Sequence, residues 1–122
     1  MPEEDVVGFV VAELGSVWAI ELMALLRRDL SRCWRKEELT SELRASPIVV
    51  QMALERLQRA ALVSAGEEGE WRFEPQDAAS DRLALKAIEL YKSHPAMIKK
   101  LLYGKQDGNL RLFADAFKFG KD

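Results

Sequence analysis

The most reactive side chain types in this 122-residue chain occur once each, as His94 and Cys33. A general base needs a nucleophile within hydrogen-bond reach, and the motif YKSHPAM around His94 matches no known arrangement of that kind. We therefore expect His94, which precedes Pro95, to be a turn or surface residue. Arg32 and Arg35 flank Cys33, and nearby positive charge favours the reactive thiolate of a redox sensor. Because the chain has no second cysteine, we favour a half-buried structural thiol.

Acidic residues are numerous, but their spacing does not suggest an active site. The pairs Glu37-Glu38 and Glu67-Glu68 are adjacent on solvated faces, whereas acid–base catalysis needs groups opposed across a cleft. The sequence also lacks a cluster of His, Cys and Asp at metal-ligand spacing and a glycine-rich phosphate loop. We expect neither an enzyme nor a protein that holds a metal or cofactor.

Composition indicates one globular domain over residues 1–122. A hydrophobic content of 48% supports a real core, and the net charge of -2 gives no overall attraction to nucleic acid. The N-terminus begins with acidic residues rather than the basic residues of a signal peptide. Glu13 and Glu21 interrupt the first apolar stretch, so no segment looks able to span a bilayer. A single cysteine also suits a reducing compartment, and we expect a cytoplasmic protein without a membrane partner.

Helical spacing of apolar residues predicts most elements of the chain. A central helix is expected over 14–30, preceded by a segment, VVGFVV, that favours helix over strand. Trp34 is expected to pack inward at a short extended link, before a second helix over 36–44. Ser46 and Pro47 suit the cap and first position of a third helix, over 47–60.

The chain beyond this third helix predicts a hairpin followed by more helices. Two short strands over 62–64 and 70–74 flank a glycine-bounded turn, with Trp71 and Phe73 facing the core. Helical spacing then resumes from Asp77, with Asp77 or Ser80 as the cap. Pro95 interrupts this pattern, which resumes after it. A last apolar face is formed by Leu110, Phe113, Ala114 and Phe117.

The stretch EELTSELRASPIVVQMALERLQRAALV, followed by GEWRFEP, resembles the winged-helix domain of bacterial MarR- and ArsR-type transcription regulators. The resemblance implies a mainly α fold: a winged helix-turn-helix with a two-stranded wing and additional N- and C-terminal helices. Its core would cover about 14–76, and a C-terminal helical extension would cover 77–122. Ala61 stands where that family usually has a glycine at a helix end.

The resemblance also implies a DNA-binding transcription regulator, usually a dimer. Its third helix would read bases in duplex DNA, with phosphate contacts from neighbouring elements and from the wing. The residues in base-reading positions would be Ser46, Gln51 and Arg56. The residues toward phosphates would be Lys36, Arg44, Arg59 and, on the wing, Arg72. The helices flanking the domain, including 110–117, would either build a homodimer or fold back onto their own domain.

Local chemistry favours an alternative, a winged-helix protein-interaction module that does not bind DNA. The exposed start of the 47–60 helix carries Ile48, Val49 and Met52, which offer apolar contact rather than hydrogen bonds to base edges. Residues 36–76 carry five basic and eight acidic side chains, a net charge of -3. Basic residues gather instead over 27–36. This cluster could grip a DNA backbone, or it could be a solvated rim of intramolecular pairs.

Overall fold

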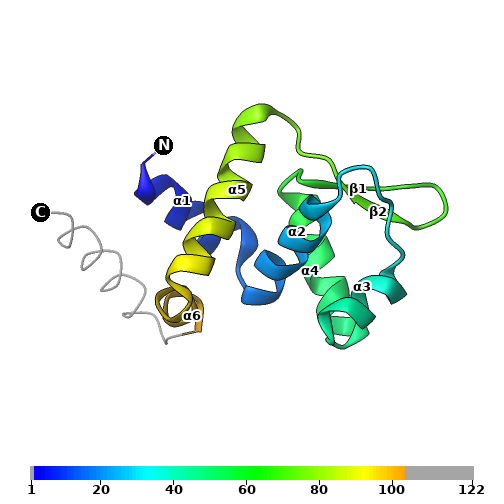
Figure 1. Cartoon of the computed structure of the whole chain (residues 1–122), viewed down its shortest axis with the longest axis horizontal. Helices are drawn as coiled ribbons and strands as arrows, with labels where there is room; N and C mark the ends of the chain where they lie inside the picture. The colour runs from blue at the N-terminus through cyan, green and yellow to red at the C-terminus, as the bar shows by residue number, and fades with distance from the viewer. Residues whose placement is uncertain (1, 104–122) are drawn as a thin grey trace, which may run out of the picture.

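The computed structural model describes residues 2–103 and is mainly helical with one small antiparallel sheet (Figure 1), which confirms the predicted class. The segment 110–117 lies outside these residues. In chain order the elements are α1 (Glu3–Phe9), η1 (Val10–Leu14), α2 (Val17–Arg28), α3 (Lys36–Leu43), α4 (Pro47–Arg59), β1 (Val63–Ala65), β2 (Trp71–Phe73), α5 (Ala78–Ser93) and α6 (Pro95–Tyr103). Among these helices, no single one is long and apolar enough to cross a bilayer.

The N-terminal segment is helical, as expected, but it is separate from the central helix. α1 continues into the π-helical turn η1, which ends at Gly15 with a left-handed φ of 72°. Ser16 then caps α2, its hydroxyl accepting a hydrogen bond from the backbone N–H of Ala19 at 3.1 Å. The two helical segments meet at 102°. The predicted helix over 14–30 is therefore wrong at both ends, because glycine and a serine cap break it at 15–16 and it stops at Arg28.

α2 lies at the centre of the domain, and every fully buried side chain in residues 2–103 is apolar. α4 packs against one side of α2, and α5 packs against another (Figure 1). Residues of α2 supply much of the core, namely Ala19, Ile20, Leu22, Met23, Leu25 and Leu26. Trp34 is buried as predicted, and its backbone exchanges two hydrogen bonds with that of Trp71 at 2.7 and 2.6 Å. This bridge ties the link before α3 to the hairpin.

The corner between α3 and α4 follows the predicted capping. Arg44 takes a left-handed conformation with φ 56°, which ends α3. The Ser46 hydroxyl accepts a hydrogen bond from Val49 N–H at 3.2 Å, and Pro47 occupies the first position of α4. The left-handed conformation of Arg44 and the cap at Ser46 together turn the chain within a few residues.

The hairpin pairs Val63 with Phe73 and Ala65 with Trp71. β2 is shorter than the predicted strand over 70–74. β1 has the predicted length but starts one residue later, because the backbone N–H of Leu62 closes the end of α4 by donating to the Leu57 carbonyl. Phe73 faces the core, and Arg72 lies exposed on the other side, as the alternation predicted.

The last two described helices follow the predicted cap and break. Asp77 is the cap of α5, since its carboxylate accepts from Ser80 N–H at 2.8 Å. α5 ends at Ser93, and α6 begins at Pro95. α6 returns to the central helix, where the Tyr103 hydroxyl accepts a hydrogen bond from Val17 N–H at 2.8 Å.

Candidate interaction surface on α4

α4 has one buried apolar face and one exposed apolar face. Val50, Leu54 and Leu57 are fully buried against the rest of the domain. On the outside, the side chains of Ile48 and Met52 are 70% and 61% exposed. Residues four apart lie above one another on a helix, so these two form a continuous apolar surface. We call Ile48, Met52 and the half-buried Val49 the α4 face.

The predicted base-reading residues do not act together in this conformation. The Ser46 hydroxyl is used as a helix cap, and the Gln51 amide donates to the Glu55 carboxylate at 3.0 Å. Arg56 lies beside η1, with Nη1 3.5 Å from the carbonyl oxygen of Ala12. The α4 face is therefore apolar, and the polar side chains near it already have partners within the domain.

Arg56 is placed by the turn between η1 and α2. A Cβ atom added to Gly15 would lie 2.7 Å from Cζ of Arg56, so the guanidinium fills the space over this glycine. The pattern in the sequence gave no sign of this contact, because the two residues are 41 positions apart. In this position the guanidinium interacts with a helix end, where carbonyl groups attract cations.

The predicted phosphate-binding residues are dispersed. Lys36 begins α3, Arg44 follows its end, and Arg59 ends α4. Arg72 on β2 forms an ion pair with Glu74 at 3.0 Å. A hydrogen bond from Ser64 and the charge of Arg72 hold the pKa of Glu74 below its ordinary value. The one basic residue on the hairpin is thus paired with a carboxylate of the same hairpin.

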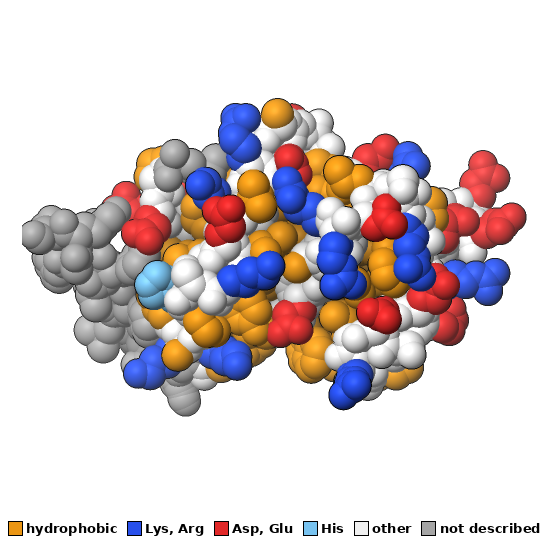
Figure 2. Space-filling view, in the orientation of Figure 1, with side chains coloured by type: hydrophobic (Ala, Val, Ile, Leu, Met, Phe, Trp, Pro, Cys, Tyr) orange, Lys and Arg blue, Asp and Glu red, His pale blue; other side chains and the backbone are white. Residues whose placement is uncertain are grey.

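Three of the five basic residues in the 27–36 cluster make intramolecular ion pairs, which favours the second of the two interpretations of this cluster. Three ion pairs are formed, Arg27 with Asp81, Arg28 with Glu42 and Arg32 with Glu38. Arg32 also stacks over the Trp34 ring, 3.5 Å from its centroid. Acidic side chains gather at the hairpin end of the face shown in Figure 2, where the turn between β1 and β2 carries Glu67 and Glu68.

The reactive residues occupy exposed positions. His94 is exposed, as predicted, with Nδ1 3.0 Å from the Ser93 hydroxyl. That hydroxyl also lies 2.9 Å from the Glu89 carbonyl oxygen, where it acts as a donor that closes the end of α5. Cys33 is exposed, so the predicted half-buried thiol is wrong. It lies in the solvated link before the Trp34 bridge, and only the tryptophan turns inward.

Comparison with other proteins gives no match, whether to a family model, a curated protein or a solved structure. Among residues 2–103, no three His, Cys, Asp or Glu side chains are close enough together to hold a metal ion. The surface feature that stands out is therefore the α4 face. Of the contacts around it, the Gln51–Glu55 bond was visible in the sequence as a pair four residues apart.

Proposed function

We propose that the chain is a winged-helix protein-interaction module, and that the α4 face binds a protein partner. The observation that carries this proposal is the exposure of Ile48 and Met52, at 70% and 61%, on the amphipathic helix α4. Interface cores are poor in charged residues and rich in apolar side chains, Met included. Removing such an apolar surface from water lowers the free energy. A partner with an apolar groove would bury the α4 face in this way.

The order of elements supports the winged-helix part of this proposal. A helix, a bridged extended link, two helices joined at a tight corner and a hairpin follow one another from α2 to β2. In DNA-binding members of this architecture the second helix of the corner enters the major groove. In the proposed architecture α4 is this second helix, and the α4 face would be the surface that meets the ligand.

The charge around α4 supports a protein ligand over DNA. Phosphate contacts by Lys and Arg supply most of the nonspecific affinity for DNA. Here residues 36–76 have a net charge of -3, from five basic and eight acidic side chains. Arg56 and Arg72 are each engaged within the domain, by Ala12 and Glu74 respectively.

Partner capture by the full-length chain tests the proposal. The double variant Ile48→Asp, Met52→Asp should lose the proteins that the wild-type chain retains from the cells that express it. Both side chains are exposed, so the thermal unfolding of the variant should match that of the wild type. The matched control is Ala79→Asp, Arg82→Asp, at two exposed positions of α5. Retention unchanged by the α4 variant would count against the proposal.

A DNA-binding transcription regulator is the second candidate. It is favoured by the exposed Ser46, Arg44 and Arg59 near the two ends of α4 and by Lys36 at the start of α3. Fluorescence anisotropy with a random-sequence duplex over a range of salt concentrations separates the candidates. A regulator would bind at low salt and lose affinity steeply as salt rises, because counterions are released on binding. The interaction module would show no such binding.

A further inference from the structure

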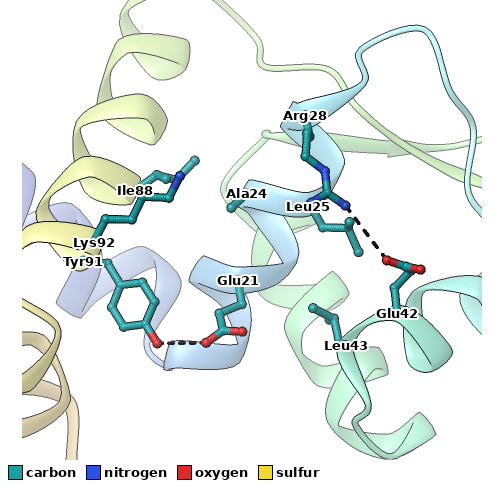
Figure 3. A pocket seen from close by; sticks show the side chains of 9 residues that line it. All are labelled: Glu21, Ala24, Leu25, Arg28, Glu42, Leu43, Ile88, Tyr91 and Lys92. Atoms are coloured by element: carbon teal, nitrogen blue, oxygen red, sulfur yellow. Dashed lines mark hydrogen bonds and ion pairs between the residues drawn. The ribbon is translucent and has the colours of Figure 1, made fainter.

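A second apolar surface lies away from α4, in a groove between α2, α3 and α5 (Figure 3). Its volume is about 340 Å³. The apolar lining comes from Ala24 and Leu25 of α2, Leu43 of α3 and Ile88 of α5. Leu25 and Ile88 are each 7% exposed, and the other two are half-buried. We call this the α2 groove.

Five polar side chains border the α2 groove; four of them form two pairs, and the fifth is Lys92 of α5. The Tyr91 hydroxyl donates to the Glu21 carboxylate at 2.8 Å, and Arg28 lies 3.9 Å from Glu42 (Figure 3). These two pairs leave an apolar strip between them on the α2 side. Such a strip suits an apolar segment better than a charged ligand, since a buried charge would need a partner of its own.

The described chain ends beside this groove. Tyr103 is the last described residue, and its hydroxyl is bonded to Val17 N–H at the first turn of α2. Glu21, where the groove begins, is one helical turn further along α2. The sequence continues for 19 residues beyond Tyr103, from Gly104 to Asp122.

We propose that the C-terminal segment Leu110–Phe117 of the same chain covers the α2 groove. Its apolar residues Leu110, Phe113, Ala114 and Phe117 fall at the spacing of one helical face. Each phenylalanine carries about 150–250 Å² of surface to bury. The strip in the groove offers apolar side chains of matching character.

The length of the connecting sequence is sufficient for this docking. Six residues, 104–109, separate Tyr103 from Leu110. Extended chain covers about 3.3 Å per residue, so these six reach roughly 20 Å. Along α2, which has 12 residues, Val17 and Arg28 are separated by about 17 Å at 1.5 Å per residue step.

The short connection also favours the same chain over a second copy. A segment tethered by a short linker has an effective concentration in the millimolar range, roughly, at the site it can reach. A free copy at ordinary protein concentration competes poorly with it. The groove is formed by α2, α3 and α5, so its occupation is independent of the proposed role of the α4 face.

Paramagnetic relaxation in the full-length chain tests the proposal. A nitroxide is attached at Lys118→Cys in a Cys33→Ser background, which leaves one thiol. Docking predicts loss of the methyl signals of Leu43 and Ile88, and their recovery when Phe113→Glu, Phe117→Glu is added. The reduced nitroxide is the matched control, and the amide spectrum of each variant reports whether the domain is folded.

Two results would overturn the proposal. The methyl signals of Leu43 and Ile88 could remain at full intensity in the labelled chain. They could also be lost in a mixture of spin-labelled chain and isotope-labelled chain without nitroxide, which would assign the groove to a second copy. Neither result depends on partner capture by the α4 face, so this proposal and the proposed function fail separately.

Discussion

Ala61 has the left-handed backbone geometry that a glycine commonly supplies at the end of a helix. Its φ is 61°, in the left-handed region. Ala61 N–H donates to the Gln58 carbonyl, and Leu62 N–H donates to the Leu57 carbonyl, both at 3.0 Å. These two bonds form the helix-ending motif for which glycine is preferred. Ala61 adopts this conformation despite its Cβ atom, which makes a left-handed backbone unfavourable for residues other than glycine.

Replacing Ala61 with glycine should therefore raise the free energy of unfolding, by about 1 kcal/mol, because the left-handed penalty disappears. Ala60→Gly is the matched control, since Ala60 has φ -80°. That change should lower stability by about 0.5–1 kcal/mol, through backbone entropy. Urea denaturation of the three proteins measures both effects. A less stable Ala61→Gly protein would contradict the role assigned to this residue.

Tyr91 should make stability depend on alkaline pH. Burial first, and then the hydrogen bond and charge of Glu21, raise the pKa of Tyr91 to about 12. In the unfolded chain a tyrosine pKa is about 10. Tyr91 therefore contributes stability that is fully present below pH 10, approximately, and is lost as pH rises toward its folded-state pKa of about 12.

The chain has two tyrosines, so Tyr103→Phe leaves Tyr91 as the single phenol for an absorbance titration. Its phenolate should appear only near pH 12 in the folded protein. Over the same pH range, the stability of Tyr91→Phe should fall less than that of the wild-type chain. Ionisation of Tyr91 at the ordinary tyrosine pKa while the protein is still folded would contradict this assignment.

At the scale of elements, helical spacing predicted which segments are helices better than where they end. The starts of α4, α5 and α6 were predictable because the caps Ser46 and Asp77 and the first residues Pro47 and Pro95 are local signals. The break at Gly15 was missed because the apolar pattern runs through it without interruption. The residue that fills the space over Gly15, Arg56, lies 41 positions away in the sequence.

The ion pair between Arg27 of α2 and Asp81 of α5 could not be predicted from the local sequence pattern either. Arg27 makes two hydrogen bonds to the Asp81 carboxylate, at 3.1 and 3.2 Å, across 54 residues. Side chain exposures of 26% and 38% mean that solvent screens the pair in part. Arg27→Met should therefore lower the free energy of unfolding by only about 1 kcal/mol.

Arg28→Met is the matched control for this prediction. Arg28 and Glu42 are 3.9 Å apart, with exposures of 68% and 56%. Removing so exposed a pair should change stability by less than about 0.5 kcal/mol. Thermal or urea unfolding gives both values. Equal losses in the two variants would show that the bidentate geometry of Arg27 brings no extra stability.

At the scale of the whole molecule, the sequence predicted the residue types of the interaction surface but not their partners. The apolar character of Ile48 and Met52 was readable, because helical spacing placed them outward. The contacts that occupy Arg56 and the 27–36 cluster are long-range or involve rotamer choices that no local pattern specifies. The charge distribution supports the same proposal, since the acidic hairpin and paired arginines leave the α4 face apolar.

A photo-crosslinking measurement tests the role of the α4 face most directly. Benzoylphenylalanine replaces Met52 in the full-length chain, in the cells that express it, and the control carries it at the exposed Arg82 of α5. If the α4 face binds a protein, a discrete protein adduct forms from position 52, is absent at position 82 and is lost when Ile48→Asp is added. An adduct to DNA from position 52, or a protein adduct that survives Ile48→Asp, would contradict this role of the α4 face.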